Sequence, residues 1–417
     1  MNKRPILISL SPNAGNDDIL LALKILMSPF TWFESGVVNE LESEFSNRFG
    51  KSYKALAVNS GRSALYLILK AMGIKEGDEV ALQALTCVAV PNAVLWLGAI
   101  PIYIDIDETL GMDPINLSNK LTRKTKAIIV QHSFGYPAKM DEVKKIAEKW
   151  NIPIIEDCAL SLGGKYKGVD LGTIGDVSFF SFGRDKVVSS VFGGMVLCKD
   201  NKLYENLLAL KDQLENPSRF WVFQQLMHPI LLSVVIKFYN FGIRKFTLGK
   251  ILLVFFQKIG FLSKAVYDIE KRSERPSVFP TKMPGALAKL AQVQLKKLNT
   301  FNEHRKLIAK YYGKSLKNII DFKLLPYIKD VVWVRYPIIS KKSKYIYDQL
   351  KKRNILLGDW YKNVIMPVGS MSIVKYKKGM CPKAESIAGN IINLPTYPLL
   401  NFKQAEKVVQ LIKLCLS

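Results

Sequence analysis

Short apolar runs alternate with amphipathic segments from about residue 55 to residue 200. The apolar runs are typical of buried strands: "YKALAVNS", "EVALQA", "PIYIDID", "KAIIVQHSFG" and "IPIIEDCA". Between them, "SALYLILKAMG", "VAVPNAVLWLGA" and "MDEVKKIAEKW" have helical patterns. Strands separated by helices of this length predict right-handed βαβ crossovers and a mostly parallel sheet with helices on both faces. We therefore expect an α/β fold whose ligands bind beyond the carboxyl ends of the strands.

The remainder of the chain has two further patterns. From about residue 286 one long helical pattern leads into a C-terminal α+β part, and the turn "FPTKMPG" marks its start. Before that turn lies a segment, residues 219–262, that is apolar and basic and has no acidic residue. Because 417 residues exceed what one hydrophobic core usually organises, we expect several parts. These are an N-terminal segment with a large domain (1–202), an insertion (203–276) and a smaller C-terminal domain with a linking helix (277–417).

The apolar and basic segment predicts a helix with one apolar stripe. Apolar residues recur in it at steps of three and four: Phe220, Phe223, Met227, Ile230, Leu231, Val234 and Phe238. A transmembrane helix needs about 20 consecutive apolar residues, and polar residues such as Gln224 and Lys237 interrupt this run too early. The pattern favours a helix or hairpin lying in the plane of a membrane, with residues 219–262 in peripheral contact with it. The alternatives are a dimerisation arm and a lid over an active site.

Composition narrows the classes of partner. The net charge of +25 favours an anionic partner, which is a nucleic acid, a membrane surface or a phosphorylated substrate. The lysines are spread over helical segments, and no nucleic-acid-binding motif is present, so we do not expect nucleic acid. The three histidines are far apart without metal-ligand spacing, so no metal is expected. The five cysteines are scattered and no signal peptide is recognisable, which favours a cytoplasmic protein with reduced thiols.

Lys186 is the first candidate for chemistry. It lies in "FFSFGRDKVVSSVFGG", where apolar and small residues surround it and a turn between two strands is predicted. A solvated loop lysine is the simpler interpretation, but two other strings, and Ser181 in the same string, accompany it. "NSGRSAL" places Ser60 and Gly61 at a strand end before a helix, where N–H groups favour a phosphate or where Ser60 merely caps the helix. Asp157 ends a buried strand and is a candidate helix cap, cation partner or partner of a pyridinium nitrogen. Ser181 precedes Lys186 by five residues, within reach of a phosphate near that lysine.

With these residues in view, the sequence resembles the DegT/DnrJ/StrS family of sugar aminotransferases, which are pyridoxal phosphate (PLP) enzymes of fold type I. The similarity runs in the family's order through "NSGRSALYLILKAMGIKEGDEV", "IPIIEDCA", "GDVSFFSFGRDK", "QVQLKKL" and "CPKAESIAGNIINLPTYPLL". The resemblance implies that Lys186 is the Schiff-base lysine, that Asp157 is the partner of the pyridine nitrogen, and that Ser181 with Gly61 and Arg62 forms the phosphate cradle. A neutral amine in a partly desolvated pocket would suit condensation with an aldehyde and proton transfer.

The same resemblance implies the rest of the biochemistry. It implies a homodimer and transamination of a keto-sugar carried by a nucleotide or a lipid phosphate. An amino acid, glutamate by resemblance, would be the donor, and the pathway would be surface polysaccharide or glycoconjugate synthesis. The expected cofactor-binding residues are Ser60, Gly61, Arg62, Cys87, Asp157, Leu160, Ser181 and Lys186.

Several family positions are altered near the cofactor. Cys87 stands where an aromatic residue usually stacks on the pyridoxal ring, so another side chain, such as one from the insertion, would have to replace it. Leu160 stands where Gln or His is common, and Pro280 where an asparagine reaches the neighbouring subunit's phosphate. One interpretation is a divergent subgroup with a different sugar or a lipid-linked acceptor. The others are a different PLP reaction, such as sugar dehydration, and a catalytically silent binding relative. The retained Lys186 favours transamination, because the dehydratase relatives carry histidine there.

Overall fold

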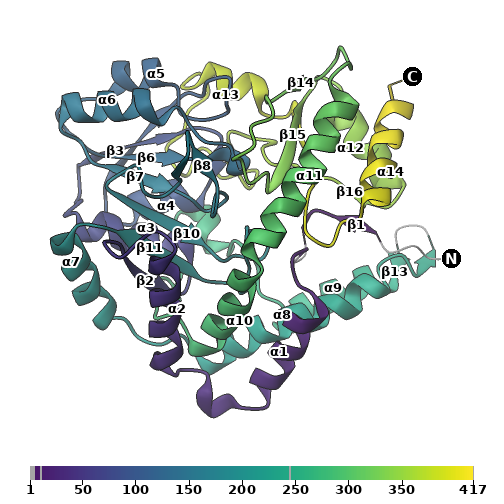
Figure 1. The fold of residues 1–417 in the computed structure, drawn as a ribbon, viewed down its shortest axis with the longest axis horizontal. Helices are drawn as coiled ribbons and strands as arrows, with labels where there is room; N and C mark the ends of the chain where they lie inside the picture. Colours follow the sequence, from purple (N-terminus) through teal and green to yellow (C-terminus); the bar gives the residue numbers. More distant parts are fainter. Residues whose placement is uncertain (1–4, 10–11, 244–245, 417) are drawn as a thin grey trace.

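A seven-stranded sheet forms the centre of the molecule (Figure 1). The computed structural model describes residues 5–9, 12–243 and 246–416. The strand order is β2 (Lys54–Val58), β11 (Gly194–Cys198), β10 (Val177–Ser181), β7 (Ile154–Asp157), β6 (Thr125–Gln131), β3 (Glu79–Gln83) and β5 (Ile100–Ile104). All neighbouring pairs are parallel except those that β11 makes with β10 and β2. The predicted mostly parallel α/β sheet is therefore confirmed.

Helices cover both faces of this sheet because its strands are apolar on both sides. In β2, Leu56 and Val58 pack on the face covered by α3 (Gly61–Ala71), α4 (Ala89–Leu95) and α7 (Asn201–Asp212). Ala55 and Ala57 point to the other face, where they share a core with α2 (Ser35–Asn47) and α10 (Gly285–Lys296). Further along that face lie α5 (Pro114–Lys120) and α6 (Met140–Trp150). The period of two along β2 is that of a strand buried between two layers.

The C-terminal part is a smaller α+β layer. Its antiparallel sheet consists of β14 (Lys323–Leu324), β15 (Arg335–Ile339) and β18 (Ile391–Pro395), next to α11 (Leu298–Leu316), α12 (Ser343–Lys352), α13 (Pro382–Ile387) and α14 (Phe402–Leu414). The long helical pattern expected from about residue 286 is divided into α10 and α11 at Lys297. A smaller hairpin pairs β8 (Lys165–Tyr166) with β9 (Val169–Asp170).

Two short strand pairs join this C-terminal part to the rest of the chain. The N-terminal β1 (Ile6–Leu7) pairs with β16 (Ile355–Leu356), and β4 (Thr86–Cys87) pairs with β17 (Ile365–Met366). Both pairs are parallel. The second pair brings the C-terminal part to the carboxyl edge of the central sheet.

The insertion forms a helical hairpin. It comprises α8 (Arg219–Lys237), the short pair β12 (Gly242–Ile243) and β13 (Phe246–Thr247), and α9 (Leu248–Lys258). A Cβ on Gly249 would lie 2.4 Å from the Cα of Tyr239, so glycine is what lets α9 start against the end of α8. Figure 1 shows α8 and α9 with α1 (Asn16–Leu26) along the lower edge of the molecule, and α8 contacts both of the others.

Among the described residues, α8 is the one helix long and apolar enough to cross a membrane. Half of the 18-residue stretch of α8 that is apolar enough is buried inside the structure, against α1, α9 and α10. By length and composition α8 is a candidate membrane span, which differs from the expectation that polar residues interrupt the apolar run too early; its half-buried state is equally that of a core helix.

A close backbone approach aligns the strand ends that carry the candidate residues. The ladder pairs Ser181 of β10 with Gly194 of β11, and Gly194 in turn with Val58 of β2. A Cβ on Gly194 would lie 2.2 Å from the carbonyl oxygen of Ser60. Only a residue without a side chain fits there, because backbone atoms cannot move aside as a flexible side chain can.

Replacing Gly194 with alanine should therefore destabilise the protein. We expect Gly194→Ala to lower the free energy of unfolding by about 2 kcal/mol or more, since overpacking against backbone forces the strand to shift. Urea denaturation measures this change. The matched control is Gly36→Ala in α2, where nothing lies within 4 Å of the added Cβ and stability should be unchanged or slightly raised. Equal stability of the two variants would show that β11 tolerates a side chain at this crossing.

Candidate active site

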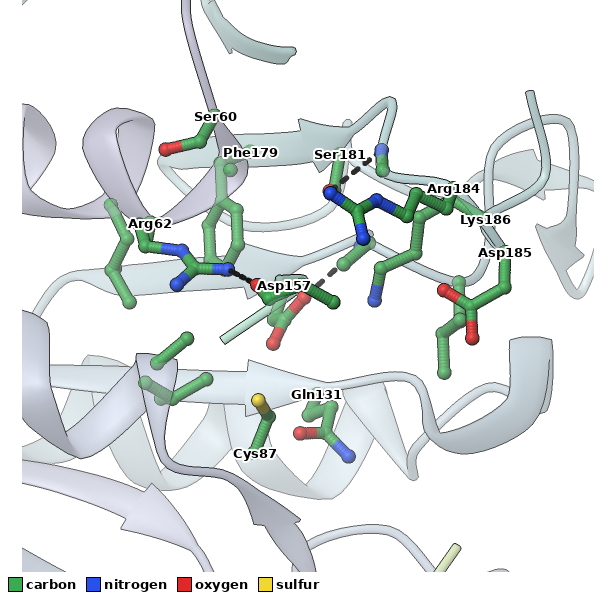
Figure 2. A pocket seen from close by; sticks show the side chains of 18 of the residues that line it. Ser60, Arg62, Cys87, Gln131, Asp157, Phe179, Ser181, Arg184, Asp185 and Lys186 are labelled. Atoms are coloured by element: carbon green, nitrogen blue, oxygen red, sulfur yellow. Dashed lines mark hydrogen bonds between the residues drawn. The ribbon is translucent and has the colours of Figure 1, made fainter. Parts of the chain in front are cut away.

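One pocket at the carboxyl edge of the central sheet brings the predicted site residues together (Figure 2). All eight predicted residues line it: Ser60, Gly61, Arg62, Cys87, Asp157, Leu160, Ser181 and Lys186. They come from the ends of β2, β4, β7 and β10 and from the turns that follow. The C-terminal part contributes Arg335, Trp360 and Tyr361 to the same wall. Parallel topology explains the convergence, because it places the carboxyl ends of neighbouring strands at one edge.

Lys186 lies in the predicted turn between β10 and β11, and hydrogen bonds from two buried side chains hold this turn in place. The Lys186 carbonyl accepts a 2.6 Å hydrogen bond from Nδ2 of Asn13, and its N–H donates to the carbonyl of Gly183 at 3.2 Å. The next carbonyl, of Val187, accepts a 2.7 Å hydrogen bond from Nη2 of Arg305. Asn13 and Arg305 are both buried. The half-buried Lys186 side chain extends from this fixed turn into the pocket (Figure 2).

Asp157 lies at the end of β7, on the floor of the pocket. Its Oδ1 accepts a 3.0 Å hydrogen bond from the N–H of Ala159, which fixes the carboxylate. Burial raises the pKa of Asp157, while the Ala159 hydrogen bond and the positive charge of Lys186 act in the opposite direction. A second positive group brought against this carboxylate would favour its ionised form. The site is therefore suited to a ligand that presents a cationic or protonated nitrogen to Asp157.

A cradle of small residues lies at the start of α3. Ser60 caps this helix, since its Oγ accepts a 3.1 Å hydrogen bond from the N–H of Ser63. A Cβ on Gly61 would lie 2.9 Å from the Cβ of Ser181, so glycine is needed for the two strand ends to meet. The first N–H groups of a helix have no partner within it and carry the positive end of its dipole. Gly61, Arg62 and the Ser181 hydroxyl thus form a surface suited to an anion such as a phosphate.

The guanidinium of Arg62 has a partner that the sequence did not reveal. The resemblance places Arg62 in the phosphate cradle, and in the structure its guanidinium forms an ion pair with the buried Glu270. Nη2 also donates to the carbonyl of Ala265 at 2.7 Å, and the guanidinium lies 4.8 Å from the centre of the Phe279 ring. The end of the insertion therefore forms part of the pocket wall and holds Arg62 there.

Arg184 is a pocket residue that the sequence analysis did not select. It donates from Nη1 to the carbonyl of Ser263 at 2.6 Å and lies 5.2 Å from the centre of the Phe192 ring. Its Nε is buried without a hydrogen-bond partner, and no carboxylate of the described residues forms an ion pair with it. Burial lowers the pKa of Arg184 to about 10. The sequence gave one indication that Arg184 lies in the pocket, namely its position two residues before Lys186.

Cys87 and Leu160 line the pocket without taking over the roles that other residue types have in the family. Burial raises the pKa of the Cys87 thiol, with Arg62 and Lys186 acting in the opposite direction, so the thiol is neutral at physiological pH. From the insertion the pocket receives Ala265 and Val266, so that segment supplies no aromatic ring. The rings that do line the pocket are Phe134, Phe179, Phe192, Trp360 and Tyr361.

His132 follows β6 into the pocket wall and was also not selected. Its Nε2 lies 3.0 Å from Oε2 of Glu156, and its Nδ1 accepts a 3.3 Å hydrogen bond from the N–H of Ala138. Burial acts to raise the pKa of Glu156, but the hydrogen bonds from His132 and from backbone N–H groups lower it overall. With Cys158, these two side chains place three metal-ligand atoms within 4.8 Å of one another. Since both Glu156 oxygens already accept hydrogen bonds, the cluster is satisfied without an ion.

Comparison with known proteins gives this pocket its context. The profile of the DegT/DnrJ/EryC1/StrS aminotransferase family matches residues 15–226 and 254–413. The chain belongs to this family. The match leaves out residues 227–253, most of the α8–α9 hairpin. Family members depend on PLP, so the chain is a PLP-dependent sugar aminotransferase, as the resemblance implied.

Individual relatives cover nearly the whole chain. A GDP-perosamine synthase of Escherichia coli O157:H7 is 30% identical over 387 residues, which are 92% of this chain and 91% of the relative. A dTDP-3-amino-3,6-dideoxy-alpha-D-galactopyranose transaminase of Aneurinibacillus thermoaerophilus is 26% identical over 400 residues, 95% of this chain and 94% of the relative. The crystal structure of the aminotransferase TlmJ from Streptoalloteichus hindustanus has the same fold, with a TM-score of 0.76 at 20% identity over 99% of both chains.

Breaking the pair of Arg62 and the buried Glu270 should strongly destabilise the protein. We expect Glu270→Gln to lower the free energy of unfolding by about 3 kcal/mol, because it leaves the Arg62 charge buried without its partner. The double variant Arg62→Met/Glu270→Gln should lose less than the single variant, since no unpaired charge remains. Urea denaturation of all three proteins measures the coupling.

The control for that cycle is the exposed pair of Arg272 and Glu274. Glu274→Gln should leave stability unchanged, because solvent screens such a pair. A Glu270→Gln protein as stable as the Glu274→Gln protein would mean that Arg62 does not depend on the insertion.

Proposed function

We propose that this aminotransferase moves an amino group from glutamate to a keto-sugar carried by a nucleotide or a lipid phosphate. The observation that carries the proposal is the shared pocket of Lys186, Asp157 and the small-residue cradle at the start of α3. An amine, a carboxylate and an anion site are what a phosphorylated pyridine aldehyde requires. We assign the reaction to surface polysaccharide or glycoconjugate synthesis on the basis of the family resemblance.

The pocket fits PLP by two features of its own. The approach of Gly61 to Ser181 leaves no room for a side chain between the start of α3 and the end of β10, and the buried Nε of Arg184 has no hydrogen-bond partner among the described residues. We propose that Ser60, the backbone N–H groups of Gly61 and Arg62, and the Ser181 hydroxyl surround the phosphate group and that Asp157 faces the pyridine nitrogen. Cys87 and Leu160 then complete the walls on either side of the ring.

PLP supplies an aldehyde that condenses with amines and a ring that withdraws electrons from the bond to be broken. Lys186 would hold the cofactor through Nζ and, once released, would carry a proton at the same Nζ from one carbon to another. The carboxylate of Asp157 would keep a proton on the ring nitrogen, with its Oδ1 oriented by Ala159. Asn13 and Arg305 would position the lysine through its backbone.

The relatives suggest the class of acceptor. Those named above are a GDP-perosamine synthase and a transaminase named for a dTDP-amino-sugar, so both names contain a nucleotide diphosphate. Arg62 is neutralised by Glu270 and Arg335 by Asp185, which leaves Arg184 as the pocket arginine without a carboxylate partner among the described residues. We propose that this cation assists in binding an anionic part of the cofactor or of the sugar carrier.

We also make proposals on the localisation of the protein and on its division into parts. We propose a cytoplasmic protein, since all five cysteines are free thiols. We also propose the division into residues 1–202, 203–276 and 277–417, with the qualification that β1 pairs with a strand of the last part.

Spectroscopy of purified protein tests the catalytic assignment. The wild-type protein loaded with PLP should show a visible absorption band, and glutamate should bleach it as the cofactor takes up nitrogen. Lys186→Ala should lose the wild-type band, because no amine remains to attach the aldehyde. Lys165→Ala, an exposed lysine in β8, should behave like the wild type. An unchanged band in Lys186→Ala would overturn the assignment, and a band insensitive to glutamate would overturn the donor.

The oligomeric state is a separate prediction. The family resemblance implies a homodimer, and we expect sedimentation equilibrium to give twice the mass of one chain. Pro280, which stands where relatives carry an asparagine that reaches the neighbouring subunit, does not line the pocket of its own chain. A mass equal to one chain at micromolar concentration would contradict the dimer.

A further inference from the structure

The outward face of α9 is apolar. Leu248, Ile251, Val254, Phe255 and Ile259 are all exposed, and they recur at steps of three and four along one side of the helix. The inward side packs Leu252, Leu253 and Phe256 against α8. An ordinary surface helix has polar residues on its outward face. The outward face of α9 is apolar instead, and the rest of the fold does not cover it.

The outward face of α8 continues this surface. Of the stripe predicted from sequence, Phe220, Val234 and Phe238 are exposed, Phe223, Met227 and Ile230 are half-buried, and Leu231 is buried. The contacts with the rest of the protein are made mainly by a different set: Trp221, Val222, Leu226, Leu232 and Val235. The helix thus has apolar residues on both its covered and its outward side, and three of the seven residues of the predicted stripe are exposed.

A third, distant segment extends the surface. Met27 at the end of α1 is 85% exposed and Phe30, in the short helix at Pro29–Thr31, is 90% exposed. The segment lies at the start of α8, because Arg219 donates a 3.2 Å hydrogen bond to the carbonyl of Pro29. We call the exposed apolar residues of α1, Phe30, α8 and α9 the hairpin surface. Nothing in the sequence pattern linked residues 27–30 to the insertion.

The charges of the hairpin itself have one sign, and the two acidic residues of α1, Asp17 and Asp18, form ion pairs with Lys297. Residues 219–262 contain six Lys and Arg and no Asp or Glu. Lys237 and Lys258 lie at the ends of α8 and α9, are exposed, and form no ion pair among the described residues. Lys24 on the outward side of α1 is likewise exposed. Apolar residues flanked by unpaired cations are the pattern of an element that lies in an anionic lipid interface.

We propose that the hairpin surface docks the enzyme on an anionic lipid membrane, with α9 and the exposed stripe of α8 in the headgroup region. A second copy of the chain is the other apolar partner, but a two-fold contact through this surface would bring the same unpaired cations together. The proposal concerns where the enzyme works and does not depend on the sugar it uses. The hairpin is also connected to the active site, because Ser263 and Ala265, just beyond α9, accept hydrogen bonds from Arg184 and Arg62.

Vesicle flotation of the PLP-loaded full chain tests the proposal. We expect co-flotation with mixed phosphatidylcholine–phosphatidylglycerol vesicles, little with phosphatidylcholine alone, and a decrease as salt is raised. Lys237→Glu/Lys258→Glu should reduce the bound fraction at least about tenfold, since each cation near an anionic surface contributes on the order of 1 kcal/mol. The matched control reverses two exposed lysines of α14, Lys403→Glu/Lys407→Glu, and should retain binding.

A second pair of variants tests the apolar contact. Phe30→Ser/Phe255→Ser should lose most flotation, whereas Ile320→Ser/Leu399→Ser, at exposed apolar positions in the C-terminal part, should not. Thermal unfolding and the mass in solution should be the same for all variants. Equal flotation of test and control variants would overturn the proposal. So would an absence of flotation together with a fall in oligomer mass in Phe30→Ser/Phe255→Ser, which would identify the surface as a contact between copies.

Discussion

The approach of Gly194 to the carbonyl of Ser60 is the constraint on which the site depends. It lets the antiparallel strand β11 fit between β2 and β10, and so brings the start of α3 against the end of β10. Gly61 and Ser181 meet there, and the turn that follows β10 carries Lys186. With β7 next to β10, Asp157 completes the floor of the pocket. The anion cradle, the amine and the carboxylate are therefore consequences of one strand arrangement.

Electrostatics then determine what the pocket accepts. Two of its arginines are neutralised inside the protein, Arg62 by Glu270 and Arg335 by Asp185. Asp157 is buried with its pKa raised, and the half-buried Arg184 has a buried Nε without a hydrogen-bond partner among the described residues. A carboxyl group and a guanidinium group that lack an ion-pair partner suit a ligand that is itself anionic at one end and cationic at the other, such as a phosphorylated pyridinium.

Sequence alone identified much of this arrangement. The strand ends at Ser60, Asp157 and Ser181 were predictable because short apolar runs end there, and the order of motifs gave the family. The sequence did not show which partners those residues find, since such contacts join segments far apart in the chain. Asn13 and Lys186 are 173 positions apart, and Arg62 and Glu270 are 208 apart. The outward direction of the α8 stripe was equally hidden, because a second set of apolar residues on the same helix, including Val222, Leu226 and Val235, packs against the protein instead.

We propose that the amine of Lys186, and of no other lysine, carries the cofactor. Borohydride reduction of the PLP-loaded enzyme, followed by proteolysis and mass spectrometry, tests it directly because reduction fixes the pyridoxyl group on the amine that holds it. We expect the modification on the peptide containing Lys186, between Arg184 and the glycine pair at Gly193 and Gly194. A pyridoxyl group on another lysine, or an unmodified Lys186 peptide in an enzyme that has bound PLP, would contradict it.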